Sequence, residues 1–101
     1  MAFKDTLEAL PQACGNALIL LDNSGAEVAR IANAPGTAGS FRVYAYLASK
    51  WGAIDTKAAE EGLRLYAEHT DDARLNPGRY PNIDRLFEVL ENNRALTAVI
   101  E

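Results

Sequence analysis

The feature that most constrains the fold is a short, wholly apolar run, Ala17–Leu21, followed directly by a tight-turn sequence. The turn, Asp22-Asn23-Ser24-Gly25, combines residues that tolerate tight bends with a glycine that can take a positive φ. The next segment, Glu27–Ala32, carries the strand formers Val28 and Ile31. The two segments are therefore predicted to form a β-hairpin. Because the first strand is apolar on both sides, we expect it to lie centrally in a sheet.

Four helices and a final strand are predicted around this hairpin from apolar spacing and capping residues. The helices are expected over Phe3–Leu10, from a Ser40 cap to Trp51, over Thr56–Thr70 after an Asp55 cap, and from an Asn82 cap to Asn92. The strand is expected over Leu96–Ile100, beside the first strand.

The predicted order is α-β-β-α-α-α-β, within a single domain over residues 1–101. Strands grouped apart from helices indicate an α+β fold, with helices packed on one face of a small, mainly antiparallel three-stranded sheet. The chain has 101 residues, of which 49% are hydrophobic, so it can bury one core of moderate size.

Charge and cysteine content limit the partners and the compartment. Ten Lys+Arg against fourteen Asp+Glu give a net charge of −4. Nucleic acid is not an expected partner, because non-specific binding to it depends on basic residues that neutralise phosphates. No apolar run approaches the ~20 residues that span a bilayer, so no membrane contact is expected. Cys14 is the single cysteine and cannot form an internal disulfide, so we expect a cytoplasmic protein. We also expect Cys14 to be a small buried side chain.

Several segments together resemble a small bacterial family of about 100 residues that is catalogued only as a domain of unknown function. These segments are Phe3–Pro11, Leu21-Asp22 with Gly25, Asn33-Ala34-Pro35-Gly36, Gly52-Ala53-Ile54-Asp55, Glu68-His69-Thr70 and Asn82-Ile83-Asp84-Arg85-Leu86. The resemblance covers nearly the whole chain. It implies a stand-alone bacterial protein and supplies no activity, substrate or site residue.

One candidate site is the loop that leads into the second predicted helix. Gly36, Thr37, Gly39 and Ser40 could let an anion approach backbone N–H groups at the start of that helix, where the helix dipole also favours negative charge. Neither G-x-G-x-x-G nor G-x-x-x-x-G-K-[ST] occurs, and no lysine follows the loop. The plainer interpretation is a strand-to-helix connection capped by Ser40.

A second candidate is the polar segment that holds the only histidine. His69 could move a proton with Asp71 or Asp72 as its orienting carboxylate. Nearby arginines could hold an anionic substrate: Arg74, Arg79 and Arg85. Alternatively, His69 lies in the last turn of its helix, where a cation is favourable. One histidine without a nearby cysteine predicts no metal site, and no motif predicts a cofactor.

The leading hypothesis is a non-catalytic binding or interaction protein, because the sequence contains no recognisable nucleophile–base set. Its partner would be another protein or a second copy of the chain. Tyr44 and Tyr46 lie two residues apart in a helix and cannot share one buried face, so Tyr46 is the predicted interface residue. The alternative is a small enzyme or anionic-ligand binder that uses the His69, Asp71 and Asp72 segment.

Overall fold

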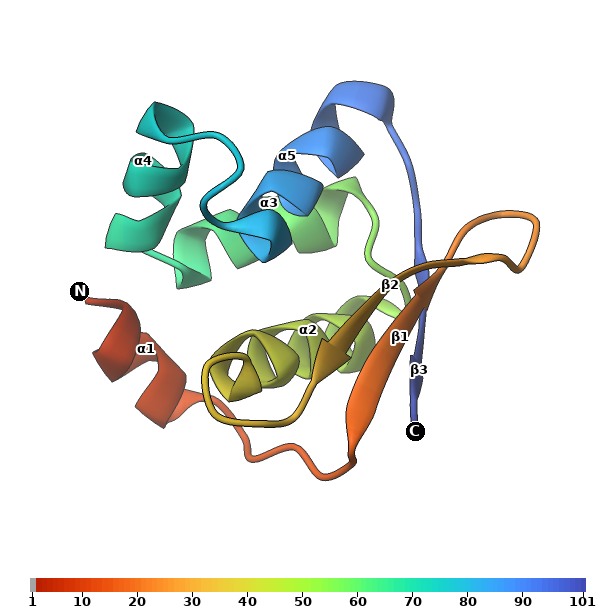
Figure 1. The fold of residues 1–101 in the computed structure, drawn as a ribbon, viewed down its shortest axis with the longest axis horizontal. Coiled ribbons are helices and arrows are strands. Elements are labelled where there is room, and N and C mark those ends of the chain that lie inside the picture. Colours follow the sequence, from red (N-terminus) through yellow and green to blue (C-terminus); the bar gives the residue numbers. More distant parts are fainter. Residues whose placement is uncertain (1) are drawn as a thin grey trace.

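The computed structural model describes residues 2–101, so Met1 of the predicted domain lies outside the described residues. Its elements, in chain order, are α1 (Phe3–Ala9), β1 (Ala17–Leu21), β2 (Glu27–Ala32), α2 (Ala38–Trp51), α3 (Thr56–Leu65), α4 (Glu68–Leu75), α5 (Pro81–Asn92) and β3 (Thr97–Ile100) (Figure 1). The α+β class is confirmed. The predicted count of four helices is wrong, because residues 2–101 contain five.

The sheet has the strand order β2-β1-β3, and both strand pairs are antiparallel. The prediction that the first strand is central is therefore confirmed. Leu18 of β1 lies opposite Ile31 on one side and Ile100 on the other. In the hairpin turn, the Asp22 carboxylate accepts backbone N–H bonds from Ser24 (2.9 Å) and Ala26 (3.0 Å).

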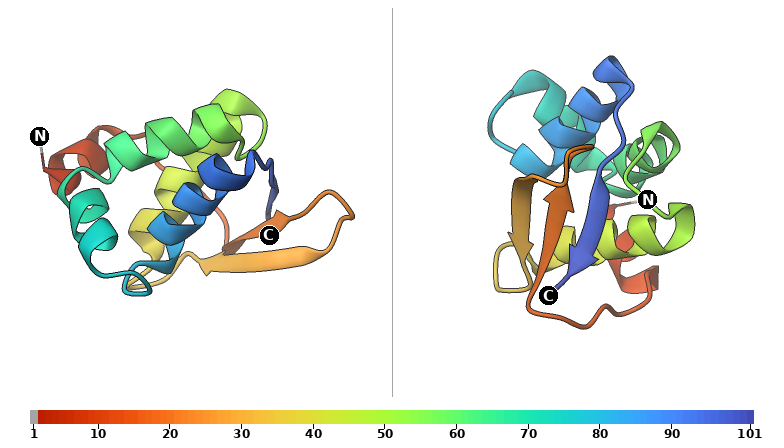
Figure 2. Two further views of the ribbon diagram at one scale, coloured as in Figure 1. Left: turned by 90° about the horizontal axis from the view of Figure 1, so that it is seen from above. Right: turned by 90° about the vertical axis from the view of Figure 1, so that its right-hand side faces the viewer.

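All five helices lie on one face of the sheet, and the opposite face is open (Figure 2). The covered face carries Leu18, Leu20 and Ile31, whose side chains are at most 2% exposed. Helix α2 packs directly against this face, and α3 and α5 pack against each other above it. Apolar side chains of the sheet and of α2, among them Phe41 and Leu47 of α2, thus form one core.

The single helix predicted over Thr56–Thr70 is wrong, because the chain bends between α3 and α4. Ala67 adopts φ 53° and ψ −119°, and the His69 N–H donates to the Tyr66 carbonyl oxygen at 3.0 Å to close the turn. Neither glycine nor proline marks this position in the sequence, so the break had no local signal.

One of the three predicted helix caps is confirmed. The Asp55 carboxylate accepts the Ala58 N–H at 2.9 Å at the start of α3. The caps predicted at Ser40 and Asn82 are wrong, because α2 begins at Ala38 and α5 begins at Pro81. Proline suits a first helical position because it has no N–H to leave unpaired.

The prediction that Cys14 is buried is wrong, because Cys14 is an exposed free thiol on the connection from α1 to β1. Among the described residues, no helix combines the length and the apolar character that a bilayer crossing needs.

Candidate functional site

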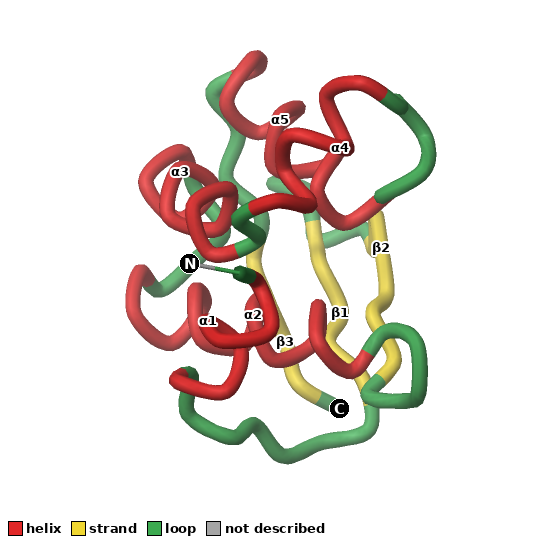
Figure 3. The backbone as a smooth tube through the Cα atoms, turned by 90° about the vertical axis from the view of Figure 1, so that its left-hand side faces the viewer, coloured by secondary structure: helices red, strands yellow, loops and turns green. Residues whose placement is uncertain are grey.

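The two candidate segments of the sequence meet at one cavity of about 350 Å³, within the size range of small-molecule sites. We call it the loop–helix cavity. Figure 3 faces the side of the molecule on which α1 and α4 lie. The cavity is lined by Phe3, Gly36, Thr37, Gly39, Ser40, Tyr66, His69, Arg79, Tyr80, Pro81, Asn82 and Ile83.

Four aromatic rings form a continuous chain along this cavity. Phe3 stacks on Tyr66 with 5.2 Å between ring centroids and 18° between planes. His69 meets the Phe3 ring edge-on at 5.2 Å and 75°. Tyr80 follows at 5.7 Å from His69. Two helices, α1 and α4, and two connections thus contribute rings to one wall, which sequence spacing alone could not predict.

Both tyrosines of this wall are held by their hydroxyl groups. The Tyr66 hydroxyl donates to Ser40 Oγ at 2.7 Å, and burial raises the pKa of Tyr66. The Tyr80 hydroxyl donates to Asp72 Oδ2 at 2.5 Å. That bond lowers the pKa of Asp72 and raises the pKa of Tyr80. These two hydrogen bonds therefore hold both tyrosine rings in place.

The start of α2 supplies backbone donors to the cavity. The N–H groups of Gly39 and Ser40 form no hydrogen bond with any of residues 2–101, as is usual in the first turn of a helix. No acidic residue lies in this first turn, so the positive end of the helix dipole is uncompensated there. Ser40 thus lies in the first helical turn and binds Tyr66 rather than capping the helix.

Arg79 brings a cationic side chain to the cavity. Its guanidinium lies 5.7 Å from the centroid of the Tyr80 ring. Its ion pair with Asp72 is loose, at 3.9 Å, and 65% of the Arg79 side chain is exposed. The guanidinium therefore keeps most of its donors available.

His69 lines the cavity from the first turn of α4, so its predicted place in the last turn of a helix is wrong. Within residues 2–101 the imidazole forms no side-chain hydrogen bond, and it packs against the Phe3 and Tyr80 rings. Asp71 is exposed and pairs with Arg74 at 3.3 Å, away from the cavity lining. Asp72 contacts two lining residues, Tyr80 and Arg79, but does not itself line the cavity. The structure thus unites His69 with Arg79 and leaves both carboxylates outside the lining.

The other two predicted arginines lie outside the cavity lining. Arg74 packs over the Phe87 ring, with 5.2 Å from its guanidinium to the centroid. Arg85 donates to Asn82 Oδ1 at 2.8 Å and to the Tyr44 hydroxyl at 3.3 Å. Burial raises the pKa of Tyr44 to about 12, despite the nearby Arg85. Arg85 therefore binds Asn82, a residue of the lining, without lining the cavity itself.

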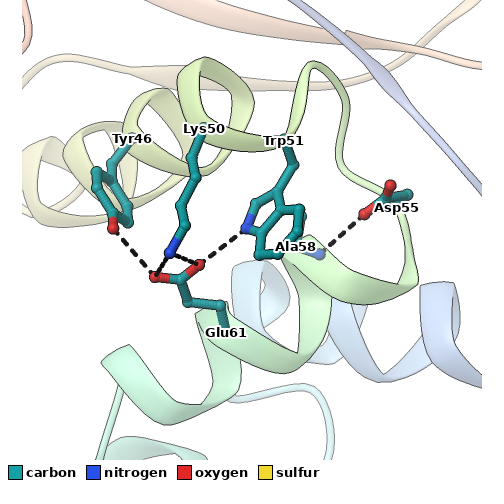
Figure 4. A network of polar contacts seen from close by, with 6 residues as sticks. All are labelled: Tyr46, Lys50, Trp51, Asp55, Ala58 and Glu61. Carbon is teal, nitrogen blue, oxygen red and sulfur yellow. Dashed lines mark hydrogen bonds and ion pairs between the residues drawn. The ribbon is translucent and has the colours of Figure 1, made fainter.

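Sequence reasoning missed a buried carboxylate on α3. Glu61 is only 9% exposed. Its oxygens accept hydrogen bonds from Tyr46 Oη (3.1 Å), Lys50 Nζ (3.1 Å) and Trp51 Nε1 (2.8 Å), all on α2 (Figure 4). The sequence pattern that could have indicated this contact is the i, i+4, i+5 spacing of the three donors on α2. Tyr46, the predicted interface residue, is thus half-buried, and its hydroxyl donates a hydrogen bond to Glu61.

Within residues 2–101, no group of three or more His, Cys, Asp and Glu side chains is placed to hold a metal ion.

The fold defines an α+β protein in which helices cover one face of a three-stranded antiparallel sheet, with an open, aromatic-walled cavity lined by helices and by the connections between elements. The chain belongs to the family described as "Uncharacterized protein conserved in bacteria (DUF2322)", whose model matches residues 3–100. The predicted resemblance to a bacterial family of unknown function is therefore confirmed. No curated protein and no solved structure matches the chain.

Proposed function

We propose that this protein binds a small anionic molecule in the loop–helix cavity. The observation that carries the proposal is the convergence of residues 36–40 and of His69, Arg79 and Tyr80 on one cavity of about 350 Å³. From the sequence, these two segments were separate candidate sites. Because they lie at one cavity, a single ligand can contact both.

The charges around the cavity support an anion. The free N–H groups of Gly39 and Ser40 lie at the positive end of α2, and Arg79 is the fully charged side chain of the lining. No carboxylate belongs to the described lining, although the chain as a whole carries a net charge of −4. The nearest carboxylates, Asp72 and Glu68, are already bonded to the Tyr80 hydroxyl and to the Phe3 N–H, outside the lining.

We propose binding rather than turnover. A nucleophilic serine needs an adjacent base within hydrogen-bond reach. Ser40 Oγ instead accepts the Tyr66 hydroxyl, and the described residues place no carboxylate on the His69 ring. A cytoplasmic setting is part of the proposal, and the exposed free thiol of Cys14 suits a reducing compartment.

A pair of probes tests the anionic requirement. Cyclohexanecarboxylate and its uncharged amide share a ring and differ in charge at neutral pH. We expect the acid to shift the NMR signals of the Gly39 and Ser40 amides, and the amide probe to leave them in place. Arg79→Gln should weaken binding of the acid, whereas Arg64→Gln, an exposed arginine of α3, should not. Equal effects of the two probes, or none from either, would contradict the proposal.

A protein interface is the second candidate, and a specific patch favours it. Tyr46 and Ile100 line one small cavity, and Ile100 is 47% exposed. Val99, the preceding residue of the same strand, is 45% exposed and points to the other face of the sheet. A half-exposed aliphatic side chain beside a tyrosine is typical of contact surfaces. Light scattering across a concentration series tests this candidate for a second copy of the chain; a strict monomer at all concentrations would remove the homodimer.

A further inference from the structure

Resting on the proposed function, we infer that the ligand is an aromatic acid, a flat ring that bears the anionic group. The proposed function concerns only the charge of the ligand. We infer the aromatic ring of the ligand from the aromatic wall of the loop–helix cavity, because a simple inorganic anion would leave most of that wall uncovered.

Three rings of the wall are partly exposed at the cavity: Phe3, His69 and Tyr80. They already pair with one another, at centroid separations of 5.2 Å (Phe3 to His69) and 5.7 Å (His69 to Tyr80). Aromatic pairs favour separations of about 4.5–7 Å in stacked or edge-on arrangements. A ligand ring that enters the cavity can therefore extend this chain of rings from an exposed face or edge.

The wall is also fixed in advance, which lowers the entropy lost on binding. Tyr66 is held by Ser40 and Tyr80 by Asp72 through their hydroxyl groups. Phe3 is held by its backbone N–H, which donates to Glu68 Oε1 at 2.7 Å. That bond lowers the pKa of Glu68 and keeps its carboxylate charged.

Aromatic walls also suit cations, but the polar groups of this cavity oppose one. A cation would face the Arg79 guanidinium and the positive end of α2, both in the lining. The nearby carboxylates of Asp72 and Glu68 lie outside the lining and already bond to Tyr80 and to the Phe3 N–H. Arg79 also lies over the Tyr80 ring and supplies a cation there from the chain itself. An anionic group beside Arg79, with its ring along the wall, satisfies both kinds of contact.

The test compares benzoate with cyclohexanecarboxylate, which carry the same charge on rings of the same number of carbons. We expect benzoate to bind the wild-type protein about twofold to tenfold more tightly, measured by NMR titration. Tyr80→Leu should abolish that preference. Tyr80→Phe keeps the ring and loses only the bond to Asp72, so it should retain most of the preference.

The control is Tyr46→Leu, since Tyr46 is likewise a half-buried tyrosine whose hydroxyl binds a carboxylate, on Glu61. It should leave the preference for benzoate unchanged. Phe3→Leu repeats the test on α1, a helix that buries none of its residues, in case Tyr80→Leu fails to fold. Equal affinity for both acids would overturn the aromatic inference alone, whereas failure of both acids to bind would overturn the proposed function.

Discussion

Among single residues, Glu61 shows how one carboxylate joins two helices. Burial alone would raise its pKa, but hydrogen bonds from Lys50, Trp51 and Tyr46 hold the pKa of Glu61 below its ordinary value. The three donors lie on α2 and the acceptor lies on α3, so the charged form of Glu61 stabilises the packing of these helices. A group with a depressed folded-state pKa stabilises the fold above its unfolded pKa.

Glu61→Gln should therefore reduce stability in a pH-dependent way. At pH 7 we expect a loss of about 1–2 kcal/mol, because charge-assisted hydrogen bonds become neutral ones. The difference from wild type should shrink as pH falls from the ordinary Glu pKa of 4.5 through the lower folded value. Denaturant unfolding at pH 7 and pH 3 measures it; a difference that stays constant across this range would contradict the assignment.

At the scale of elements, the bend between α3 and α4 delivers His69 to the cavity. Ala67 has the φ and ψ of the first central residue of a type II′ turn, where glycine is favoured because a Cβ is strained at positive φ. The bend directs α4 away from the axis of α3. Had one helix continued to Thr70, His69 would belong to a different face of the molecule.

Ala67→Gly should stabilise the protein, because glycine adopts this positive φ without the strain that a Cβ causes. We expect a gain of about 0.5–1 kcal/mol, which raises Tm by roughly 2–8 °C for a domain of this size. Thermal melting followed by circular dichroism measures the change. A lower Tm would show that the backbone at Ala67 is not strained.

The opposite kind of substitution, glycine to alanine, should destabilise the protein at Gly62 in α3. A Cβ at Gly62 would lie 2.7 Å from Leu86 Cδ1 and 2.9 Å from Leu47 Cδ1, and both leucines are fully buried. Gly62→Ala should cost about 1–3 kcal/mol through overpacking, despite the better helix propensity of alanine. Chemical denaturation checks this expectation. A stabilised variant would mean that α3 and α5 can move apart freely.

At the scale of the whole molecule, the last strand closes the fold. β3 pairs with the central strand β1, and Leu96 before it is 2% exposed and forms a bridge with Ile54. A lone hairpin is only marginally stable in water. A chain that ends after Asn92 should therefore lose cooperative melting in calorimetry. A sharp transition that survives this truncation would contradict the architecture.

The sequence predicted those parts of the fold that depend on local chemistry. The hairpin, the central first strand and the Asp55 cap follow from residues that are close in the chain. The bend at Ala67 carries no sequence signal, and the burial of Glu61 depends on donors of another helix. The meeting of residues 36–40 with His69 and Arg79 is likewise a tertiary contact between segments that are far apart in sequence.

The most direct test is a crystal structure of the protein grown with benzoate. We predict one benzoate in the loop–helix cavity, with its carboxylate within hydrogen-bond distance of the Gly39 or Ser40 N–H and of Arg79, and its ring against Tyr80. An empty cavity at saturating benzoate, or a cavity filled by side chains of the protein itself, would contradict the account.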